Sequence, residues 1–187
     1  NMSKGTGIRG ARGILHKNDK IIRPLLPFTR EKIEKYAQSN DIPYRDDESN
    51  QSLKYDRNFI RHKVIPPLME HRKDAIQKMG IFASRMQDAF TLYQKGVADE
   101  LNKIIKIRNN AEYLSLKGLK MKPYWKTLIF EWLHSKHFSA NEIEEVLTIT
   151  QSESGKWVEN NSYQVIKDRK FLILYSKRAD SNEIFWI

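Results

Sequence analysis

The stretch DAIQKMGIFASRMQDAFTLYQKGVADELNKI, residues 74–104, contains the strongest structural pattern of the chain. Its apolar side chains recur every three or four residues, a spacing that places them on one face of a helix. The pattern therefore predicts a helix of about thirty residues whose apolar face packs against the protein interior. That face consists of Ile76, Met79, Phe82, Ala83, Met86, Phe90, Tyr93, Val97, Leu101 and Ile104.

Helical patterns also dominate the rest of the chain. Residues Thr29 to Ser39 and Trp125 to Leu133 predict further amphipathic helices. Ser139 and Glu142 form the pattern of a capping box, in which each side chain accepts a hydrogen bond from a backbone N–H of the first helical turn. After Gly155 the apolar period changes to two, which predicts short strands joined by turns. We therefore expect a mainly α fold with a small antiparallel β-hairpin unit near the C-terminus.

The charge of the chain favours a polyanionic partner. Lys and Arg total 33 against 23 Asp and Glu, which gives a net charge of +10. Such an excess favours RNA or DNA over a membrane surface. A surplus of charge can also serve solubility alone, and this second interpretation stays open.

Composition excludes several kinds of site. The 187 residues include no cysteine, which excludes disulfides and thiolate zinc sites. The five histidines do not have the spacing of metal ligands, so we expect no metal site. No apolar run reaches the roughly eighteen residues needed to span a bilayer, and no secretory signal opens the chain. We expect a cytoplasmic protein without a membrane partner.

Polar motifs between residues 21 and 67 indicate a binding or catalytic site. Asp47 and Asn50 can hydrogen-bond to their own backbone and build a rigid turn. Arg57 and Arg61 are four residues apart, so on a helix both guanidinium groups leave the same face. This planar, permanently charged group suits phosphates and developing oxyanions. A glycine- and arginine-rich segment, residues 5–13, also suits a phosphate-rich partner, and it equally suits a flexible connector.

Each motif also has a purely structural interpretation. The polar residues at 47–50 could form a capped turn that has no ligand role. Arg57 and Arg61 could form salt bridges with the acidic residues at 46–48. Both interpretations stay open, and the structural and functional roles can coexist.

Four motifs in this order and spacing resemble the tRNA(Ile)-lysidine synthetases, which modify the wobble cytidine of an isoleucine tRNA. The resemblance covers residues 3–61 motif by motif and continues more loosely to residue 175 as a helical region followed by a β-hairpin. The motifs are the glycine/arginine segment Lys4–Gly10, the Arg-Pro-Leu-Leu motif Arg23–Leu26, the acidic-x-Ser-Asn turn Asp47–Asn50 and the Arg-Asn-x-Ile-Arg helix start Arg57–Arg61.

The chain departs from this family at the ATP site. The family carries a Ser-Gly-Gly-x-Asp-Ser loop on an N-terminal domain, and this sequence contains no such string. We therefore expect a C-terminal part of a lysidine synthetase that lacks the N-terminal PP-loop ATPase domain and is inactive alone. Residues 1–67 would be the tail of the catalytic domain with its linker, and residues 68–187 a helical tRNA-binding domain that ends in a β-hairpin.

The resemblance implies that the parent enzyme uses ATP and Mg²⁺ to adenylate the cytidine, after which free lysine displaces AMP. The fragment would bind tRNA(Ile) and supply supporting arginines, with no cofactor of its own, and homodimer formation is left open. By this resemblance Arg57 and Arg61 are catalytic candidates. The substrate-binding candidates are Arg9, Arg12, Arg23, Asp47, Ser49, Asn50 and Asn58.

Two other classes of function remain as alternatives. A stand-alone, non-enzymatic nucleic-acid-binding module would explain the positive charge and the missing ATP loop. A helical protein–protein adaptor would explain the long amphipathic helix but not the arginine and asparagine motifs.

Overall fold

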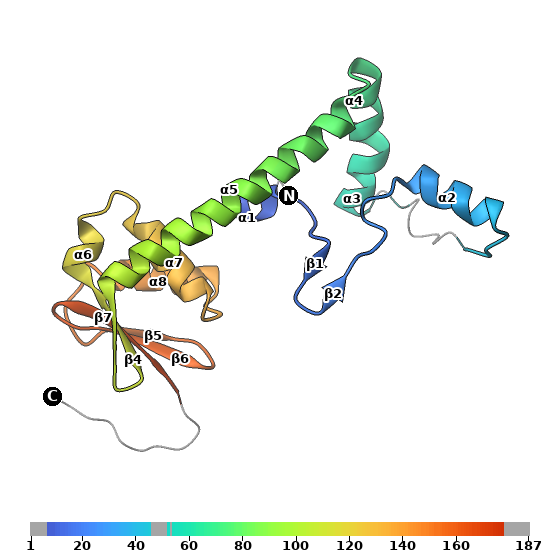
Figure 1. The fold of residues 1–187 in the computed structure, drawn as a ribbon. Helices are drawn as coiled ribbons and strands as arrows, with labels where there is room; N and C mark the ends of the chain where they lie inside the picture. The colour runs from blue at the N-terminus through green and yellow to red at the C-terminus, as the bar shows by residue number, and fades with distance from the viewer. Residues whose placement is uncertain (1–6, 46–51, 53, 178–187) are drawn as a thin grey trace. The chain divides into compact units, whose positions relative to one another are not determined.

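The computed structural model describes residues 7–45, 52 and 54–177. The chain separates into two compact units, unit 1 (Asn1–Thr91) and unit 2 (Leu92–Ile187), which we describe separately. The division falls inside helix α5 (Ala75–Ile104), the long helix in Figure 1. This helix confirms the helix predicted from the apolar spacing of residues 74–104, but its predicted core face is only partly covered: Phe90 is buried, whereas Met79 is 50% exposed and Ile76 and Phe82 are 44% exposed. The predicted domain boundary at residues 67–68 stays a prediction.

Unit 1 consists of short elements that bury few apolar side chains. Strands β1 and β2 form an antiparallel hairpin in which Lys17 pairs with Ile22. In the described part of this unit, Ala75 and Phe90 are the buried apolar side chains. The elements before α5 are α1 (Ile8–Ala11), β1 (Lys17–Asn18), β2 (Ile21–Ile22), α2 (Arg30–Ser39), α3 (Asp56–Phe59), the π-helical turn η3 (Ile60–Val64) and α4 (Ile65–His71).

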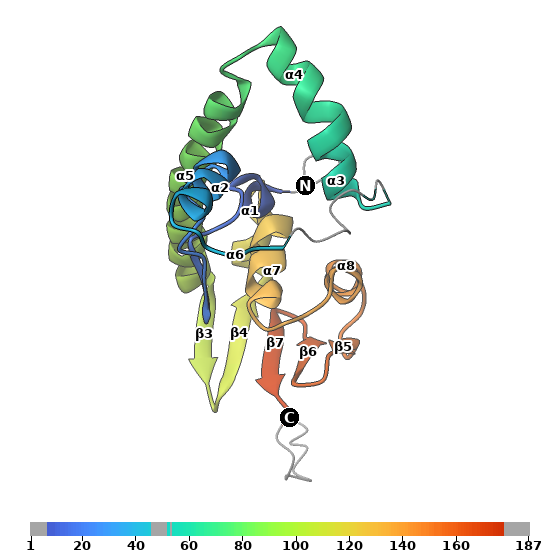
Figure 2. The same ribbon diagram turned by 90° about the vertical axis from the view of Figure 1, so that its right-hand side faces the viewer.

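Unit 2 is built on a five-stranded antiparallel sheet with the strand order β3-β4-β7-β6-β5. Burial alternates along β7, where Leu172 and Leu174 face the core, as expected for a sheet with one covered face. Helices α7 and α8 cover that face (Figure 2). Their side chains Leu128, Ile129 and Val146 belong to the core. The elements are β3 (Ile105–Arg108), β4 (Ala111–Ser115), α6 (Leu116–Lys120), α7 (Trp125–His134), α8 (Ala140–Ile149), β5 (Trp157–Glu159), β6 (Tyr163–Lys167) and β7 (Phe171–Ser176).

The fold is mixed α/β rather than mainly α, which corrects the prediction from sequence. Helices account for about 52% of the structure, beside the five-stranded sheet and a two-stranded hairpin. The expected helices and C-terminal antiparallel strands are present, but those strands belong to a larger sheet. It is larger because β4 pairs with β7, with Ser115 opposite Phe171, and so joins strands that lie far apart in sequence.

Strand β3 is one of the elements that sequence analysis did not predict, together with α1, the β1–β2 hairpin and α6. Ile105 follows Leu101 by four residues, so it also fits the spacing of the preceding helix. The tight turn from β3 to β4 uses Asn109 and Asn110, whose φ angles are 47° and 60°. Asparagine tolerates this left-handed conformation better than other non-glycine residues, and two such residues match the backbone twist of a hairpin.

The capping box at the start of α8 is confirmed. The Ser139 Oγ accepts a hydrogen bond from the Glu142 N–H at 3.3 Å, and the Glu142 Oε2 accepts one from the Ser139 N–H at 2.6 Å. We expect Ser139→Ala to lower the free energy of unfolding by about 1 kcal/mol, because it leaves one N–H of the first turn without its acceptor. Thermal or urea unfolding measures the change. Ser162→Ala, at an exposed serine between β5 and β6, serves as a control, and equal stabilities of the two variants would contradict this prediction.

We expect the Glu100 carboxylate to make the stability of unit 2 depend on pH. Hydrogen bonds from Lys103 (2.6 Å) and Lys122, together with one from the Tyr124 hydroxyl (3.2 Å), lower the pKa of Glu100 from 4.5 to about 2. Because the folded-state pKa is below the unfolded value, the stabilisation is present above pH 4.5 and is lost as the pH falls towards 2. We expect Glu100→Gln to be less stable than the unchanged chain at pH 6, with the difference shrinking in urea unfolding at pH 3. A difference independent of pH would contradict this account.

Two features are absent from the residues that the structure describes. In the described ranges, no helix has both the length and the apolar character that a membrane crossing requires. Among the same residues, His, Asp and Glu side chains form no group of three or more that could hold a metal ion.

Candidate nucleic-acid interface

Arg57 and Arg61 lie on a continuous helical run formed by α3, η3 and α4. The π-helical turn η3 comes directly before α4, whose first turn contains Pro66 and Pro67. Proline has no N–H to donate, so the carbonyl groups one turn before each proline lose their usual hydrogen-bond donor. A π-helical turn changes the hydrogen-bond pattern at this point and is one way to accommodate those carbonyl groups. The run therefore continues to His71.

Both arginines of this run are available to a ligand. Arg57 and Arg61 are exposed, and the Arg57 guanidinium lies 5.7 Å from the centre of the Tyr55 ring. Within the residues that the structure describes, no carboxylate forms an ion pair with either arginine; residues 46–51 lie outside that range. Two exposed guanidinium groups on one helix can bind phosphate oxygens, so the sequence-based assignment of Arg57 and Arg61 stays a prediction with compatible geometry.

Asn58 fixes the start of the helix that carries these arginines. Its side chain is fully buried, and its Nδ2 donates a hydrogen bond to the Ser52 carbonyl oxygen at 2.9 Å. A buried side chain of this kind supports its neighbours, and direct contact of Asn58 with a substrate stays a prediction. Asp47, Ser49 and Asn50, the predicted turn, lie outside the described residues.

The other predicted substrate-binding arginines make local contacts in unit 1. The guanidinium groups of Arg9 and Arg12 lie 5.1 Å and 4.3 Å from the centre of the Phe90 ring, which is 1% exposed. These cation–π contacts attach α1 to α5. The Arg23 Nη1 donates a hydrogen bond to the Leu15 carbonyl oxygen at 3.2 Å. All three arginines are half-buried, so part of each remains accessible, and their contact with RNA stays a prediction.

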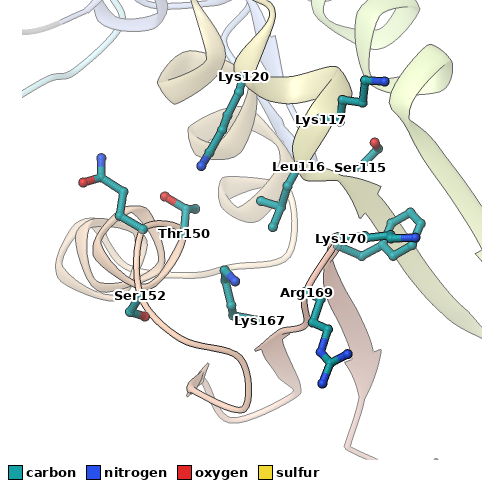
Figure 3. Close-up of a pocket in the computed structure, with 11 residues that line it drawn as sticks. Ser115, Leu116, Lys117, Lys120, Thr150, Ser152, Lys167, Arg169 and Lys170 are labelled. Carbon is teal, nitrogen blue, oxygen red and sulfur yellow. The ribbon is translucent and has the colours of Figure 1, made fainter.

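The structure adds a cationic pocket in unit 2 that sequence analysis did not single out. Its volume is about 520 Å³. It lies between α6, the end of α8 and the turn from β6 to β7, as Figure 3 shows. Its lining residues are Ser115, Leu116, Lys117, Lys120, Thr150, Gln151, Ser152, Lys167, Arg169, Lys170 and Phe171.

The pocket has a strongly positive lining. Five of its residues carry a positive charge and none carries a negative charge: Lys117, Lys120, Lys167, Arg169 and Lys170. In the part of unit 2 that the structure describes, none of these five forms an ion pair with a carboxylate. In Figure 3, Lys120 and Lys167 extend towards the Thr150 side of the pocket, whereas Arg169 points outward at its rim. The arrangement can bind an anion.

Lys167 is the residue that could have revealed this pocket from sequence. Strand β6 alternates, and Lys167 follows Val165 by two residues, so both side chains face the same side of the sheet. Val165 is fully buried and Lys167 is 7% exposed. A lysine at a core-facing strand position is unusual, because lysine is almost never buried without a partner. The remaining lining residues come from separate segments, and only the fold brings them together.

Comparisons with known proteins cover both units. Residues 1–68 match the PP-loop domain family, and residues 107–177 match the TilS substrate-binding domain family. The tRNA(Ile)-lysidine synthase of Porphyromonas gingivalis (strain ATCC BAA-308 / W83) is 30% identical over 188 residues, which is 99% of this chain and 40% of that protein. The enzyme of the same name from Bacteroides thetaiotaomicron is 29% identical over 180 residues, or 96% of this chain and 41% of that protein.

Identity is higher in a shorter match. The tRNA(Ile)-lysidine synthase of Thermotoga maritima is 48% identical over 67 residues, which is 36% of this chain and 16% of that protein. The chain spans about two fifths of the length of the curated relatives that it matches from end to end.

The PP-loop match corrects one expectation. The chain was expected to lack the PP-loop domain, whereas residues 1–68 match that family. The error came from equating the domain with its Ser-Gly-Gly-x-Asp-Ser string, which the printed sequence does not contain, although such a domain extends well beyond its phosphate loop. The PP-loop and substrate-binding matches, with similarity across nearly the whole chain, support the tRNA(Ile)-lysidine synthase (TilS) family for this protein.

Proposed function

We propose that this chain is part of an ATP-dependent enzyme that ligates lysine to the wobble cytidine of tRNA(Ile). In this proposal, the chain contributes tRNA binding through unit 2 and supporting arginines through unit 1. The cationic pocket carries the proposal, because it lies within residues 107–177, the region that matches the TilS substrate-binding domain. A cluster of positive charges that no carboxylate of the described residues neutralises is suited to RNA phosphates.

The arginines of unit 1 have a separate proposed role. Arg57 and Arg61 lie within residues 1–68, the region that matches the PP-loop domain. Both side chains are exposed, and both residues lie within the helical run, Arg57 in α3 and Arg61 in η3, so their backbone has a defined helical geometry. Fixed guanidinium groups can offset negative charge that develops during a reaction more effectively than mobile ones. We therefore infer that Arg57 and Arg61 support the reaction.

ATP and Mg²⁺ are proposed for the whole enzyme. The described residues of this chain do not fit a Mg²⁺ site, because they contain no cluster of carboxylates or other ligands that could hold a metal ion. The sequence also contains no Ser-Gly-Gly-x-Asp-Ser loop. We therefore derive no step of the reaction through either group from the residues of this chain.

The proposed function is tested by lysine incorporation. The full-length protein that contains this chain should transfer labelled lysine to tRNA(Ile) in the presence of ATP. A tRNA(Ile) in which the wobble cytidine is replaced by uridine should remain unlabelled. The 187-residue chain serves as a negative control, since it lacks the phosphate loop. If the full-length protein binds tRNA without incorporating lysine, the alternative of a non-enzymatic nucleic-acid-binding module is correct.

We expect the 187-residue chain to bind tRNA with a strong dependence on salt. Each phosphate that a lysine or arginine neutralises adds about 0.7 to 0.9 to the slope of log affinity against log salt concentration. Binding is measured by fluorescence anisotropy between low and physiological salt, with an unrelated tRNA as a control that should bind with similar affinity. An affinity that does not change with salt would contradict the electrostatic account and favour the adaptor.

A further inference from the structure

The buried lysine of the unit 2 pocket, Lys167, forms one hydrogen bond and no ion pair within the described residues. Lys167 is 7% exposed, and its Nζ donates one hydrogen bond, at 3.2 Å, to the carbonyl oxygen of Asp168. An ammonium group has three donors, so this bond satisfies only part of its capacity. Removing a charge from water is costly unless a counter-ion and further hydrogen bonds compensate. Within the described residues no carboxylate supplies that compensation.

The neighbours of Lys167 indicate which ligand would supply it. Lys120 extends into the same pocket from α6 (Figure 3). Lys117, Arg169 and Lys170 are exposed around the pocket. This arrangement provides one buried ammonium group, a second, exposed one that extends into the pocket, and further cations along the edges. Such a set suits a group with several anionic oxygens that continues beyond the pocket, and lysine is a common ligand of phosphate.

The size of the pocket argues for more than a free phosphate ion. Its volume of about 520 Å³ lies in the range of about 300 to 1,000 Å³ that is typical of small-ligand sites. Leu116 and the ring of Phe171 add apolar surface to the lining. A nucleotide unit has the matching composition, with an anionic phosphate and a less polar sugar and base.

We propose that this pocket binds one nucleotide of the bound RNA, with its backbone phosphate held between Lys120 and Lys167. Lys117, Arg169 and Lys170 then contact the phosphates on either side. This inference rests on the proposed function for the identity of the RNA, a tRNA. The inference adds to the proposed function a specific phosphate-binding position in unit 2, which is far in sequence from Arg57 and Arg61 of unit 1.

A competing structural role for Lys167 makes a different prediction. The pocket also contains Thr150 and Gln151, which follow the last turn of α8, where the helix dipole is negative. If Lys167 only stabilises this helix end, its removal lowers the melting temperature and leaves RNA affinity unchanged.

The test compares two substitutions that remove the same charge. Lys167→Met removes the buried ammonium group of the pocket and keeps the side-chain length. Lys106→Met makes the same chemical change at an exposed position of β3 outside the pocket. We expect Lys167→Met to weaken tRNA binding by about tenfold, as for the loss of a hydrogen bond to a charged group. Its salt slope should fall by about 0.7 to 0.9, whereas Lys106→Met should change the affinity by about twofold or less. Equal effects of the two substitutions would overturn the proposal.

A second variant tests the proposal if Lys167→Met does not fold. Lys120 is exposed, so Lys120→Met should leave the melting temperature unchanged and still weaken tRNA binding by about tenfold. Unchanged affinity of a folded Lys120→Met variant would overturn the proposal.

Small competitors distinguish RNA from other sources of phosphate. Inorganic phosphate and uridine 5′-monophosphate should displace tRNA only at millimolar concentration. If the chain binds the free nucleotide tightly, and Lys167→Met abolishes that binding while tRNA affinity stays unchanged, the pocket is a free-nucleotide site and the proposal is overturned.

The proposal and the proposed function fail independently. Lysidine formation by the full-length protein, combined with unchanged tRNA affinity of the pocket variants, would reject the pocket and keep the enzyme. Weakened tRNA binding by the variants, without lysidine formation by the full-length protein, would reject the enzyme and keep the pocket.

Discussion

Replacing Arg57 or Arg61 by alanine in the proposed full-length enzyme should reduce turnover by about a hundredfold to a thousandfold and change tRNA affinity little. Each arginine is exposed on the helical run that begins at Asp56, and Asn58 fixes the start of that run through its hydrogen bond to Ser52. A donor held in place for charge that develops in the transition state contributes about 2.7–4 kcal/mol. A single phosphate contact among many would contribute less and would appear in the dissociation constant.

Single-turnover kinetics at saturating tRNA measure this effect separately from binding. Lysine at either position should restore little activity, because a point charge does not reproduce the planar, forked guanidinium. Lys63→Ala is the matched control, since it removes an exposed positive charge from η3, the turn that also contains Arg61. If only the tRNA dissociation constant changes in the arginine variants, Arg57 and Arg61 are RNA anchors and the catalytic assignment is wrong.

Leu128→Ala should lower the free energy of unfolding of unit 2 by about 2–5 kcal/mol, because it removes buried methyl groups and leaves a cavity. Leu128 lies in α7 and is 1% exposed within the core formed by α7, α8 and the sheet. Leu92→Ala makes the same chemical change in α5, where the side chain is 73% exposed, and should alter stability by no more than about 0.5 kcal/mol.

Urea unfolding followed by tryptophan fluorescence measures both variants. All four tryptophans of the sequence lie after residue 91, so the signal reports on unit 2. The unchanged chain and both variants should have the same slope of unfolding free energy against urea concentration. Similar losses for Leu128→Ala and Leu92→Ala would show that α7 does not pack on the sheet in solution as it does in the structure.

Local sequence patterns predicted helix α5 and the capping box of α8 correctly. Helix α5 and the capping box of α8 depend on hydrogen bonds and contacts between residues at most a few positions apart. The same is true of the Thr29 cap of α2, whose Oγ1 accepts a hydrogen bond from the Lys32 N–H at 3.3 Å. The motifs that resemble the lysidine synthetases are also local, and the comparisons support that family.

The structural contacts of the candidate arginines were less predictable. Arg9 and Arg12 are far from Phe90 in sequence, so their contact with its ring had no local signal. Asn58 stood out in sequence as part of an Arg-Asn-x-Ile-Arg motif, and only the structure shows that its side chain is buried against the Ser52 carbonyl.

The sequence by itself determined the longer helices, the positive charge and the motifs of unit 1, because each depends on composition or on neighbours within one or two helical turns. Only the tertiary structure decided the size of the sheet and the position of the cationic pocket. Strand β4 finds β7 across more than fifty residues, with Leu114 opposite Leu172, and a pairing at that distance depends on which apolar faces meet when the chain collapses. The same pairing brings Ser115 beside Phe171, and the pocket then forms where α6, α8 and the β6–β7 turn converge around Lys167.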